Sequence, residues 1–335
     1  MAPMVLLGLA AATAGVSWAL CAALLPILRA RAILDHPNAR SSHARPTPRG
    51  GGIAVIGAVV VVWVAIAALG AAEFPAILLI GAAGLALVSW FDDLKGLGPA
   101  PRLAAQLVAV GGAWLVLAPA GPVFQGWLPP VLDTVAALVL WMWFINLFNF
   151  MDGIDGIAGV ETLCIGAGVG LVGAISGAGG VALAAILAGA AAGFLPWNWQ
   201  PAKLFLGDVG SIPLGFLLGW LLLDLAADGR WAAALILPAY YLADATITLV
   251  RRASRGARPW RAHREHFYQR AVRGGCSHRR ATTAVAAADL GLIGCAVAAA
   301  LGALPQVAAL ISSVVLVAGL MWYFDRAAKS APPGS

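Results

Sequence analysis

Long apolar runs separated by short polar segments make up most of the chain. The runs fall at 4–28, 51–70, 74–91, 103–119, 131–148, 157–176, 181–195, 211–227, 231–250, 281–302 and 305–324. A membrane-spanning helix needs about 20 mostly apolar residues, with roughly 17 as the lower end. The pattern therefore predicts an all-α, polytopic membrane protein of about eleven transmembrane helices. Because 181–195 is short, ten is the alternative count.

Composition supports this class. The 335 residues are 61% hydrophobic and 11% charged, whereas a soluble domain is about a quarter charged. No long linker or low-complexity segment divides the chain, so we expect residues 1–335 to form a single domain. The first apolar run lacks a basic leading segment and is too long for a signal-peptide core, which predicts a retained first helix. The four cysteines form no C-x-x-C pair, and we interpret them as small hydrophobic residues.

The basic residues lie almost entirely in alternate loops. If alternate loops share a side, then 29–50, 92–102, 149–156, 196–210, 251–280 and the C-terminal tail hold all the Lys and Arg except Arg230. The positive-inside rule places these loops in the cytoplasm, with the N-terminus periplasmic and the C-terminus cytoplasmic. The net charge of +6 is thus a sign of topology in a bacterial inner membrane, and we expect no nucleic-acid partner.

Five polar clusters occupy these predicted cytoplasmic loops. The first, DHPNARSSHARPTPRGGG at 35–52, carries Arg45 and Arg49 and ends in three glycines at a predicted helix start. The free N–H groups of a helix N-terminus can hold an anion, so we expect Gly50, Gly51 and Gly52 to offer theirs to one. The alternative is a basic, topology-setting loop with a glycine break.

The second cluster, WFDDLKG, places two adjacent acids at the end of the third predicted helix. Asp92 and Asp93 repel each other and are costly at a membrane interface unless they meet a cation or a proton. Acids at a helix C-terminus also oppose the helix dipole, so capping does not explain them. The alternative is a simple helix stop, because Gly96 and Pro99 follow.

The third and fourth clusters bring further carboxylates. In NLFNFMDGIDG, polar residues recur at three-residue steps, at Asn146, Asn149, Asp152 and Asp155. Such hard oxygen donors suit Mg²⁺, and a polar network between helices is the alternative. In FLGDVGS, Asp208 lies between two glycines, before a helix that we expect to begin at Ser211 as its N-cap.

The fifth cluster, RAHREHFYQR, carries His263, Arg264 and His266 in the longest basic loop. A cationic loop above an acidic site suits a clamp for a diphosphate, and a topology-setting loop is the alternative. Acids within apolar runs are functional candidates. We expect Asp244 to line the site and Asp289 to make a polar contact between helices.

Carboxylates, a metal and a cationic loop at a membrane surface together indicate phosphoryl chemistry on a lipid. A carboxylate near the attacking phosphate would position or deprotonate it. The chain has no P-loop and no G-x-S-x-G motif, so NTPase and serine-hydrolase functions have no support.

The motifs PRGGG, DDLKGL, NLFNFMDGIDG, FLGDVGS and HREHFYQR, in this order over about residues 30–280, resemble those of the polyprenyl-phosphate N-acetylhexosamine-1-phosphate transferases. This family includes the MraY, WecA and WbpL types. The resemblance implies transfer of a sugar-1-phosphate from a UDP-N-acetyl sugar to undecaprenyl phosphate in the lipid bilayer. It also implies release of UMP and a requirement for Mg²⁺, for which we expect Mn²⁺ to substitute.

The resemblance also implies residue roles. Asp92 and Asp93 would act on the lipid phosphate, in a catalytic group with Asp152. The metal ligands would be Asp208, Asn149 and Asp152, and the nucleotide would contact Asp155, Asn198 and Phe205, the last by stacking on uracil. The phosphate and substrate contacts would be Arg45, Arg49, Lys95, Arg102, His263, Arg264 and His266. We favour a single displacement over an aspartyl-phosphate intermediate, which these residues leave open.

One departure from the family concerns the substrate. The MraY type carries three adjacent histidines where this chain reads His263-Arg264-Glu265-His266. This favours the WbpL type, which serves O-antigen or other surface polysaccharides with UDP-GlcNAc or a deoxy N-acetyl sugar. The alternative within the family is phospho-N-acetylmuramoyl-pentapeptide transfer. The alternative outside it is a proton- or ion-coupled transporter or flippase, and a homodimer is compatible with the sequence.

Overall fold

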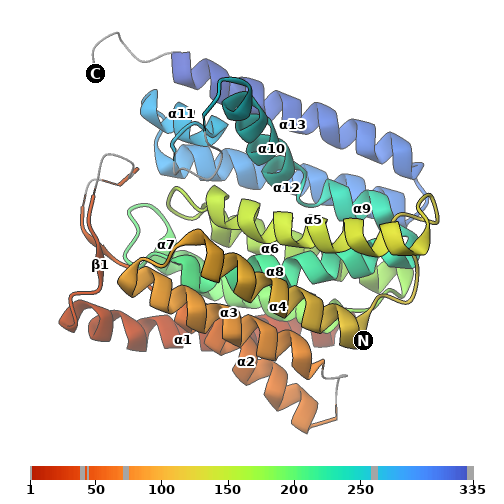
Figure 1. The fold of residues 1–335 in the computed structure, drawn as a ribbon, viewed down its shortest axis with the longest axis horizontal. Coiled ribbons are helices and arrows are strands. Elements are labelled where there is room, and N and C mark those ends of the chain that lie inside the picture. The colour runs from red at the N-terminus through yellow and green to blue at the C-terminus, as the bar shows by residue number, and fades with distance from the viewer. Residues whose placement is uncertain (1, 38–41, 44, 71–74, 258–262, 330–335) are drawn as a thin grey trace.

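The computed structural model describes residues 2–37, 42–43, 45–70, 75–257 and 263–329, and its regular elements are helices apart from two short strands, as predicted (Figure 1). The helices are α1 (Pro3–Ala30), α2 (Gly52–Ala68), α3 (Ala76–Lys95), α4 (Pro99–Leu117), α5 (Pro130–Met151), α6 (Ile157–Ser176), α7 (Val181–Asn198), α8 (Asp208–Leu225), α9 (Trp231–Ile236), α10 (Ala239–Ser254), α11 (Phe267–Arg273), α12 (His278–Ala300) and α13 (Gln306–Lys329). A π-helical turn, η1 (Ala226–Arg230), joins α8 to α9. The two strands are β1 (Leu34–Asp35) and β2 (Thr47–Pro48).

Each predicted apolar run coincides with helix. Within the described chain, nine helical stretches are long and apolar enough to cross a membrane, counting Asp208–Ile236 as one, and α2 is an apolar helix of 17 residues. The run 231–250, expected as one span, is instead divided into α9 and α10 at Pro238. Proline lacks the N–H that a helix interior needs, so the first helix ends before it and the second begins after it.

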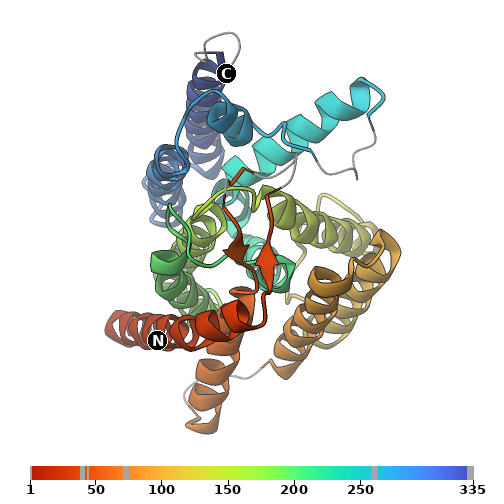
Figure 2. The same ribbon diagram turned by 90° about the vertical axis from the view of Figure 1, so that its left-hand side faces the viewer.

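Helix α8 lies at the centre of the bundle. All its residues from Val209 to Leu223 are buried, and the other helices surround it when the molecule is seen end-on (Figure 2). Trp141 of α5 stacks on Phe216 of α8, with ring centroids 4.9 Å apart, and its Nε1–H donates to the Phe216 carbonyl at 2.8 Å. A helix that is apolar on every side belongs inside a bundle, and this one carries Asp208 at its first position.

The loops that the charge pattern assigned to one side do meet at one end of the bundle. The β1–β2 hairpin, α11 and the last turn of α13 lie at this end, whereas α1 begins at the opposite end (Figure 1). We call it the hairpin end. The strands pair antiparallel, with Leu34 opposite Pro48 and Asp35 opposite Thr47.

Two glycines bring α2 against the start of α8. A Cβ atom on Gly52 would lie 2.2 Å from the Cα and N of Gly210, a separation that real side chains do not tolerate. Small residues at a helix interface allow the backbones of membrane helices to approach closely. This contact holds the segment after the hairpin beside Asp208.

Candidate active site

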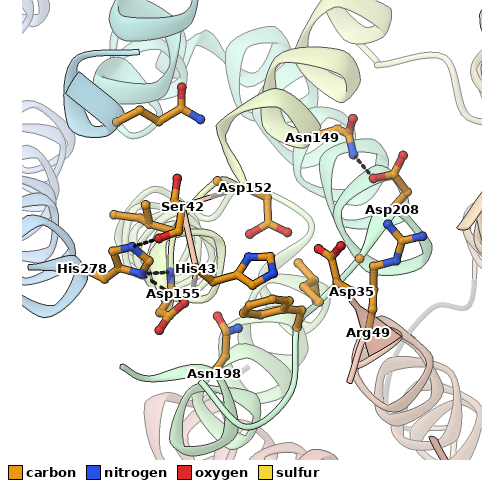
Figure 3. A pocket seen from close by; sticks show the side chains of 16 residues that line it. Asp35, Ser42, His43, Arg49, Asn149, Asp152, Asp155, Asn198, Asp208 and His278 are labelled. Atoms are coloured by element: carbon orange, nitrogen blue, oxygen red, sulfur yellow. Dashed lines mark hydrogen bonds and ion pairs between the residues drawn. The ribbon is translucent and has the colours of Figure 1, made fainter. Parts of the chain in front are cut away.

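A polar cavity of about 350 Å³ opens at the hairpin end (Figure 3). Seven of the residues predicted to form a site line it: Arg49, Asn149, Asp152, Asp155, Asn198, Phe205 and Asp208. They come from the ends of α5, α7 and α8 and from the segments before α2, after α5 and before α8. Gln269 of the fifth motif also lines the cavity, so residues from four of the five sequence motifs meet around one space.

Arg102 links two of the acids. Its Nη1 lies 2.9 Å from Asp92 Oδ2, and its Nη2 lies 3.1 Å from Asp208 Oδ2. The Asn149 amide donates to Asp208 Oδ1 at 2.9 Å and to Ser211 Oγ at 2.8 Å. The structure thus joins α3, α4, α5 and α8 through one network of charged and amide groups.

The start of α8 corrects the expectation for Ser211. The helix begins at Asp208, three residues earlier than predicted, and its N-cap position is Gly207. Ser211 lies inside the first turn, where its hydroxyl donates to the Gly207 carbonyl at 3.3 Å. Glycine suits the cap because its φ is +74° and a Cβ there would lie 2.9 Å from Asp93 Oδ2.

Asp93 supplies the cap that Gly207 lacks. Its Oδ2 accepts the N–H of Val209 at 3.3 Å, and its Oδ1 lies 3.4 Å from Arg49 Nη2. A carboxylate at a helix N-terminus satisfies free N–H groups and is favoured by the helix dipole. The adjacent acids therefore take different partners: Asp92 pairs with Arg102, whereas Asp93 holds α8 and Arg49.

Asp152, in the loop after α5, is the exception among these acids. Within the described residues, its side chain has no hydrogen bond or ion pair, and it points into the cavity (Figure 3). Burial, followed by the nearby carboxylates of Asp208, Asp155 and Asp93, raises its pKa from the ordinary 3.8 to about 7. A carboxylate with only negative neighbours suits a cation or a proton.

The donor set around Asp152 fits Mg²⁺. Asp152 and Asp208 supply carboxylate oxygens to the same cavity. The Oδ1 of Asn149 is a further oxygen donor, since its one hydrogen bond among the described residues, from Arg102 Nη2, is long at 3.5 Å. Within the described chain, no three His, Cys, Asp or Glu side chains form a complete cation cage. Mg²⁺ usually takes one or two protein carboxylates and keeps waters and substrate phosphates as its other ligands, so two carboxylates facing a cavity are sufficient.

Asp155 and Asn198 organise the opposite wall of the cavity. Asp155 Oδ1 lies 3.2 Å from His278 Nδ1, and its Oδ2 accepts the N–H of Ala202 at 3.0 Å. Asn198 accepts the N–H of Gly156 at 2.9 Å and donates to the Leu204 carbonyl at 3.0 Å. Both side chains tie the loop after α5 to the loop before α8 while they line the cavity.

Phe205 presents a partly exposed ring to the cavity. The ring of His43 meets it edge-on, with centroids 4.9 Å apart, and the buried Nε2 of His43 has no partner among the described residues. An aromatic face beside an unpaired polar nitrogen suits a planar heterocycle with polar edges.

The glycine segment does not offer its N–H groups to an anion, contrary to expectation. Those of Gly50 and Gly51 donate to the Phe205 carbonyl at 3.2 and 2.8 Å, and that of Gly52 donates to the Leu206 carbonyl at 2.8 Å. Close packing of α2 on the segment before α8 provides these acceptors. The glycines therefore position Phe205 and do not bind a ligand through their N–H groups.

The histidine loop lies beside the cavity and does not line it. His266 is buried, with its Nδ1 3.0 Å from Asp244 Oδ1. The ring of His263 lies 4.9 Å from that of His266. Burial, followed by the nearby His266 and Arg252, lowers the pKa of His263 to about 4. His263 is therefore neutral at pH 7, and Arg264, which is partly buried, supplies charge in this segment.

Asp244 does not line the cavity as expected, because it caps α11. Its carboxylate accepts the N–H of Phe267 at 3.0 and 3.1 Å and the hydroxyls of Tyr240 and Thr248 at 3.0 and 3.1 Å. The four free N–H groups of a short helix need acceptors, and Asp244 supplies one from α10. Its role is to hold α11 at the hairpin end.

Two further basic residues lie outside the cavity. Arg45 is exposed, and Lys95 is exposed with its Nζ 5.8 Å from the centroid of the Phe91 ring. Asn146 is also away from the cavity, because its amide exchanges hydrogen bonds of 2.7 and 3.4 Å with Gln106 of α4. For Asn146, the polar network between helices is the observed arrangement.

Several cavity residues were not identified from the sequence. Asp35, Ser42, Gln269 and His278 line the cavity, and the Nε2 of His278 lies 3.0 Å from the Ser42 carbonyl oxygen. His278 lies near the end of the predicted basic loop 251–280 and begins α12, and no nearby motif marks it. Gln269 lies within HREHFYQR, where the sequence indicated only His263, Arg264 and His266 as substrate contacts.

The comparisons with known proteins agree with this geometry. The model of glycosyl transferase family 4 matches residues 75–226, which carry Asp92, Asp93, Asp152 and Asp208. The decaprenyl-phosphate N-acetylglucosaminephosphotransferase of Mycolicibacterium smegmatis is 30% identical over 351 aligned positions, covering 90% of this chain and 83% of the relative. The protein of the same description from Mycobacterium tuberculosis is 32% identical, covering 73% and 70%. A phospho-N-acetylmuramoyl-pentapeptide-transferase of Streptococcus thermophilus is 32% identical, covering 49% and 52%.

Proposed function

Since this chain belongs to the polyprenyl-phosphate hexosamine-1-phosphate transferases of glycosyl transferase family 4, we propose that it transfers N-acetylhexosamine-1-phosphate from a UDP-sugar to undecaprenyl phosphate. UMP leaves, and the lipid-diphosphate-linked sugar begins the synthesis of O-antigen or another cell-surface polysaccharide. The observation that carries the proposal is the meeting of Asp92, Asp152 and Asp208, from three separate motifs, around one end of a bundle of apolar helices.

The place of the cavity suits both substrates. A lipid phosphate headgroup lies at the membrane surface, and a nucleotide sugar arrives from water, so they meet at the end of a helix bundle. We assign the hairpin end to the cytoplasm of a bacterial inner membrane because its loops carry nearly all the basic residues.

Asp152 and Asp208 would hold Mg²⁺, with the Asn149 carbonyl oxygen as a further candidate. The bound metal would neutralise the charge that builds on the diphosphate oxygens during transfer. We expect Mn²⁺ to substitute, because it accepts the same oxygen ligands. The unpaired Asp152 carboxylate is the feature of this chain that supports the site.

The other cavity residues have matching proposed tasks. Phe205 would stack on the uracil, beside His43, and Asp155 and Asn198 would frame the nucleotide from the opposite wall. Arg49 lines the cavity and pairs with Asp93, whereas Arg102 joins Asp92 to Asp208 beside the cavity, and both would contact phosphate oxygens. Guanidinium groups suit this role because their N–H donors match phosphate geometry.

We favour a single displacement. An oxygen of the lipid phosphate forms a bond to the phosphorus that carries the sugar, and the bond from that phosphorus to UMP breaks. Asp92 or Asp93 would position the lipid phosphate or accept its proton. Both already lie in the network that reaches Asp208.

The names of the relatives bear on the sugar. The two mycobacterial proteins are described as N-acetylglucosaminephosphotransferases of decaprenyl phosphate, which supports UDP-GlcNAc as the first donor to test. The streptococcal protein supports UDP-N-acetylmuramoyl-pentapeptide as the second. UDP-linked deoxy N-acetyl sugars are the third class of donor to test, because the motifs resemble those of the WbpL type.

The test is an assay of UMP release by the purified protein in lipid nanodiscs with Mg²⁺. Each UDP-N-acetyl sugar is supplied with undecaprenyl or decaprenyl phosphate. We expect UMP release with one sugar, dependent on both the lipid and the metal. Absence of UMP with every combination would refute the proposal, and uptake of a labelled solute by reconstituted vesicles would support the transporter alternative.

A further inference from the structure

A second polar cavity lies at the hairpin end, between α10, α11 and α13. Its volume is about 490 Å³. Its wall contains two carboxylates and five cationic side chains: Arg251, Arg255, Arg270, Arg273 and Lys329. Positive groups gathered at this density repel one another, so the arrangement favours an anion.

The two carboxylates do not balance the cations. Asp325 pairs with Arg270 and Lys329, each at 2.6 Å. Glu265 is shared between Arg255, at 3.8 Å, and the buried Arg252. Arg251 and Arg273 have no carboxylate partner among the described residues.

An aromatic ring holds two of the guanidinium groups in place. The guanidinium carbons of Arg251 and Arg270 lie 4.9 and 5.5 Å from the centroid of the Phe267 ring. Phe267 is itself buried, and its backbone N–H donates to the Asp244 carboxylate. Contact with a ring restrains a guanidinium group while its N–H donors stay free for a phosphate.

The cavity is at the depth of a membrane surface. Asp325 and Lys329 lie in the last turns of α13, a helix of spanning length. The exposed Trp322 lies one turn before Arg326, whose guanidinium carbon is 4.2 Å from the centroid of the Trp322 ring. Tryptophan and arginine are typical anchors at the headgroup level. Helix α10 runs outward from the bundle, so the cavity is on the flank of the molecule (Figure 2).

This cavity is distinct from the candidate active site. None of its lining residues also lines the first cavity. Helix α11 lies between the two: Gln269 faces the first cavity, whereas Arg270 and Arg273 face the second. A ligand in the basic cavity would therefore not occupy the substrate space.

We propose that the basic cavity between α10, α11 and α13 binds the phosphate headgroup of an anionic membrane lipid. The cations donate to the phosphate oxygens, and the acyl chains stay in the bilayer beside α13. Basic pockets between membrane helices on the cytoplasmic side are suited to such headgroups.

The experiment measures binding of fluorescent phosphatidylglycerol to the full-length protein in neutral detergent, with phosphatidylcholine as the reference lipid. Each basic residue near an anionic surface contributes roughly fivefold in affinity. The double variant Arg251→Gln/Arg273→Gln should therefore bind phosphatidylglycerol about 25-fold more weakly. The variant Arg251→Lys/Arg273→Lys keeps both charges and should retain most of the affinity.

The matched control is Arg29→Gln/Arg31→Gln, which removes two exposed charges from the same end of the bundle, outside the cavity. It should bind as the unmodified protein does. Equal binding of the two lipids, or an unchanged affinity in the first variant, would overturn the proposal. Displacement of the lipid by millimolar inorganic phosphate would assign the cavity to a soluble anion. Displacement by undecaprenyl phosphate at concentrations that support turnover would assign it to the acceptor.

Discussion

The partners of each carboxylate separate the roles of the acids at the level of single residues. Asp92 and Asp208 share Arg102, and Asp93 caps α8, so these three are held in place before any ligand arrives. Of the carboxylates that line the cavity, Asp35 and Asp152 have no hydrogen bond or ion pair among the described residues, and burial and negative neighbours raise the pKa of Asp152. It is therefore the carboxylate whose ionisation should govern the binding of a cation.

We predict that Mg²⁺ binding weakens in acid through Asp152. Its pKa of about 7 in the metal-free protein means that a proton competes with the cation below pH 7. Ionisation falls from about nine-tenths at pH 8 to about one-tenth at pH 6, so the apparent affinity should fall about tenfold. Calorimetric titration at the two pH values measures this. Asp152→Asn should bind weakly at both, and a tenfold change that persists in this variant would exclude Asp152 as the source.

We predict that Asp208→Ala lowers the rate of UMP release by about a hundredfold or more, because it removes a charged ligand from the reacting centre. The control is Asp224→Ala, which removes an acid from the opposite end of the same helix. It should leave the rate nearly unchanged. Comparable loss in the two variants would point to a damaged helix, and near-normal activity in Asp208→Ala would exclude Asp208 as an essential ligand.

At the level of elements, the approach of α2 to α8 sets the place of the site. Gly52 meets Gly210 without room for a side chain, and the neighbouring N–H groups of Gly50 and Gly51 hold the Phe205 carbonyl. The position of Phe205 relative to Asp208 therefore depends on backbone contacts between two helices.

We predict that Gly52→Ala is destabilising and lowers activity, because the new Cβ would lie 2.2 Å from Gly210. Overpacking of this kind typically costs about 1–3 kcal/mol. The control is Gly57→Ala on the same helix, where the nearest atom, Leu20 Cδ1, is 3.6 Å away. Gly52 is the first residue of α2 and Gly57 lies in its interior, so alanine adds helix propensity mainly at Gly57. A loss of UMP release confined to Gly52→Ala therefore reports the close approach. Equal behaviour of the two variants would show that α2 can move away without harm.

The elements were predictable to the extent that they depend on local pattern. Apolar runs must be helical in a bilayer because unpaired backbone groups have no water to bond, and each predicted run is helical. The division of 231–250 had a local signal in Pro238, which the apolar pattern outweighed. No local signal indicated the acceptors of the Gly50–Gly52 N–H groups, because these acceptors are the carbonyls of Phe205 and Leu206, about 150 residues away.

The candidate site divides in the same way. Acids that share a motif and a side of the membrane were expected to meet, and Asp152, Asp155 and Asp208 do line one cavity. The role of Asp244 as a cap for α11 depends on how α10 packs, so its burial in an apolar run could not reveal it. His278 reaches the cavity only because α12 begins there.

At the scale of the whole molecule, the two ends of the bundle differ in charge and in chemistry. The hairpin end carries the candidate site, the basic cavity and nearly all the basic residues. The transfer that we propose, from a soluble UDP-sugar to a lipid, needs this end in the cytoplasm, where nucleotide sugars are made. The proposed function and the positive-inside rule therefore both require the hairpin end to face the cytoplasm.

We predict that a cysteine at the hairpin end reacts only from the cytoplasmic side. In a chain whose own cysteines are replaced by alanine, Ser254→Cys places an exposed thiol at the end of α10, and Ala303→Cys places one in the turn between α12 and α13 at the opposite end (Figure 1). A membrane-impermeant maleimide should label Ser254→Cys in inverted vesicles and Ala303→Cys in intact spheroplasts. Because one spanning helix, α12, separates these two positions, both results must hold together. Labelling of Ser254→Cys in spheroplasts would place the site outside the cell, away from its proposed donor.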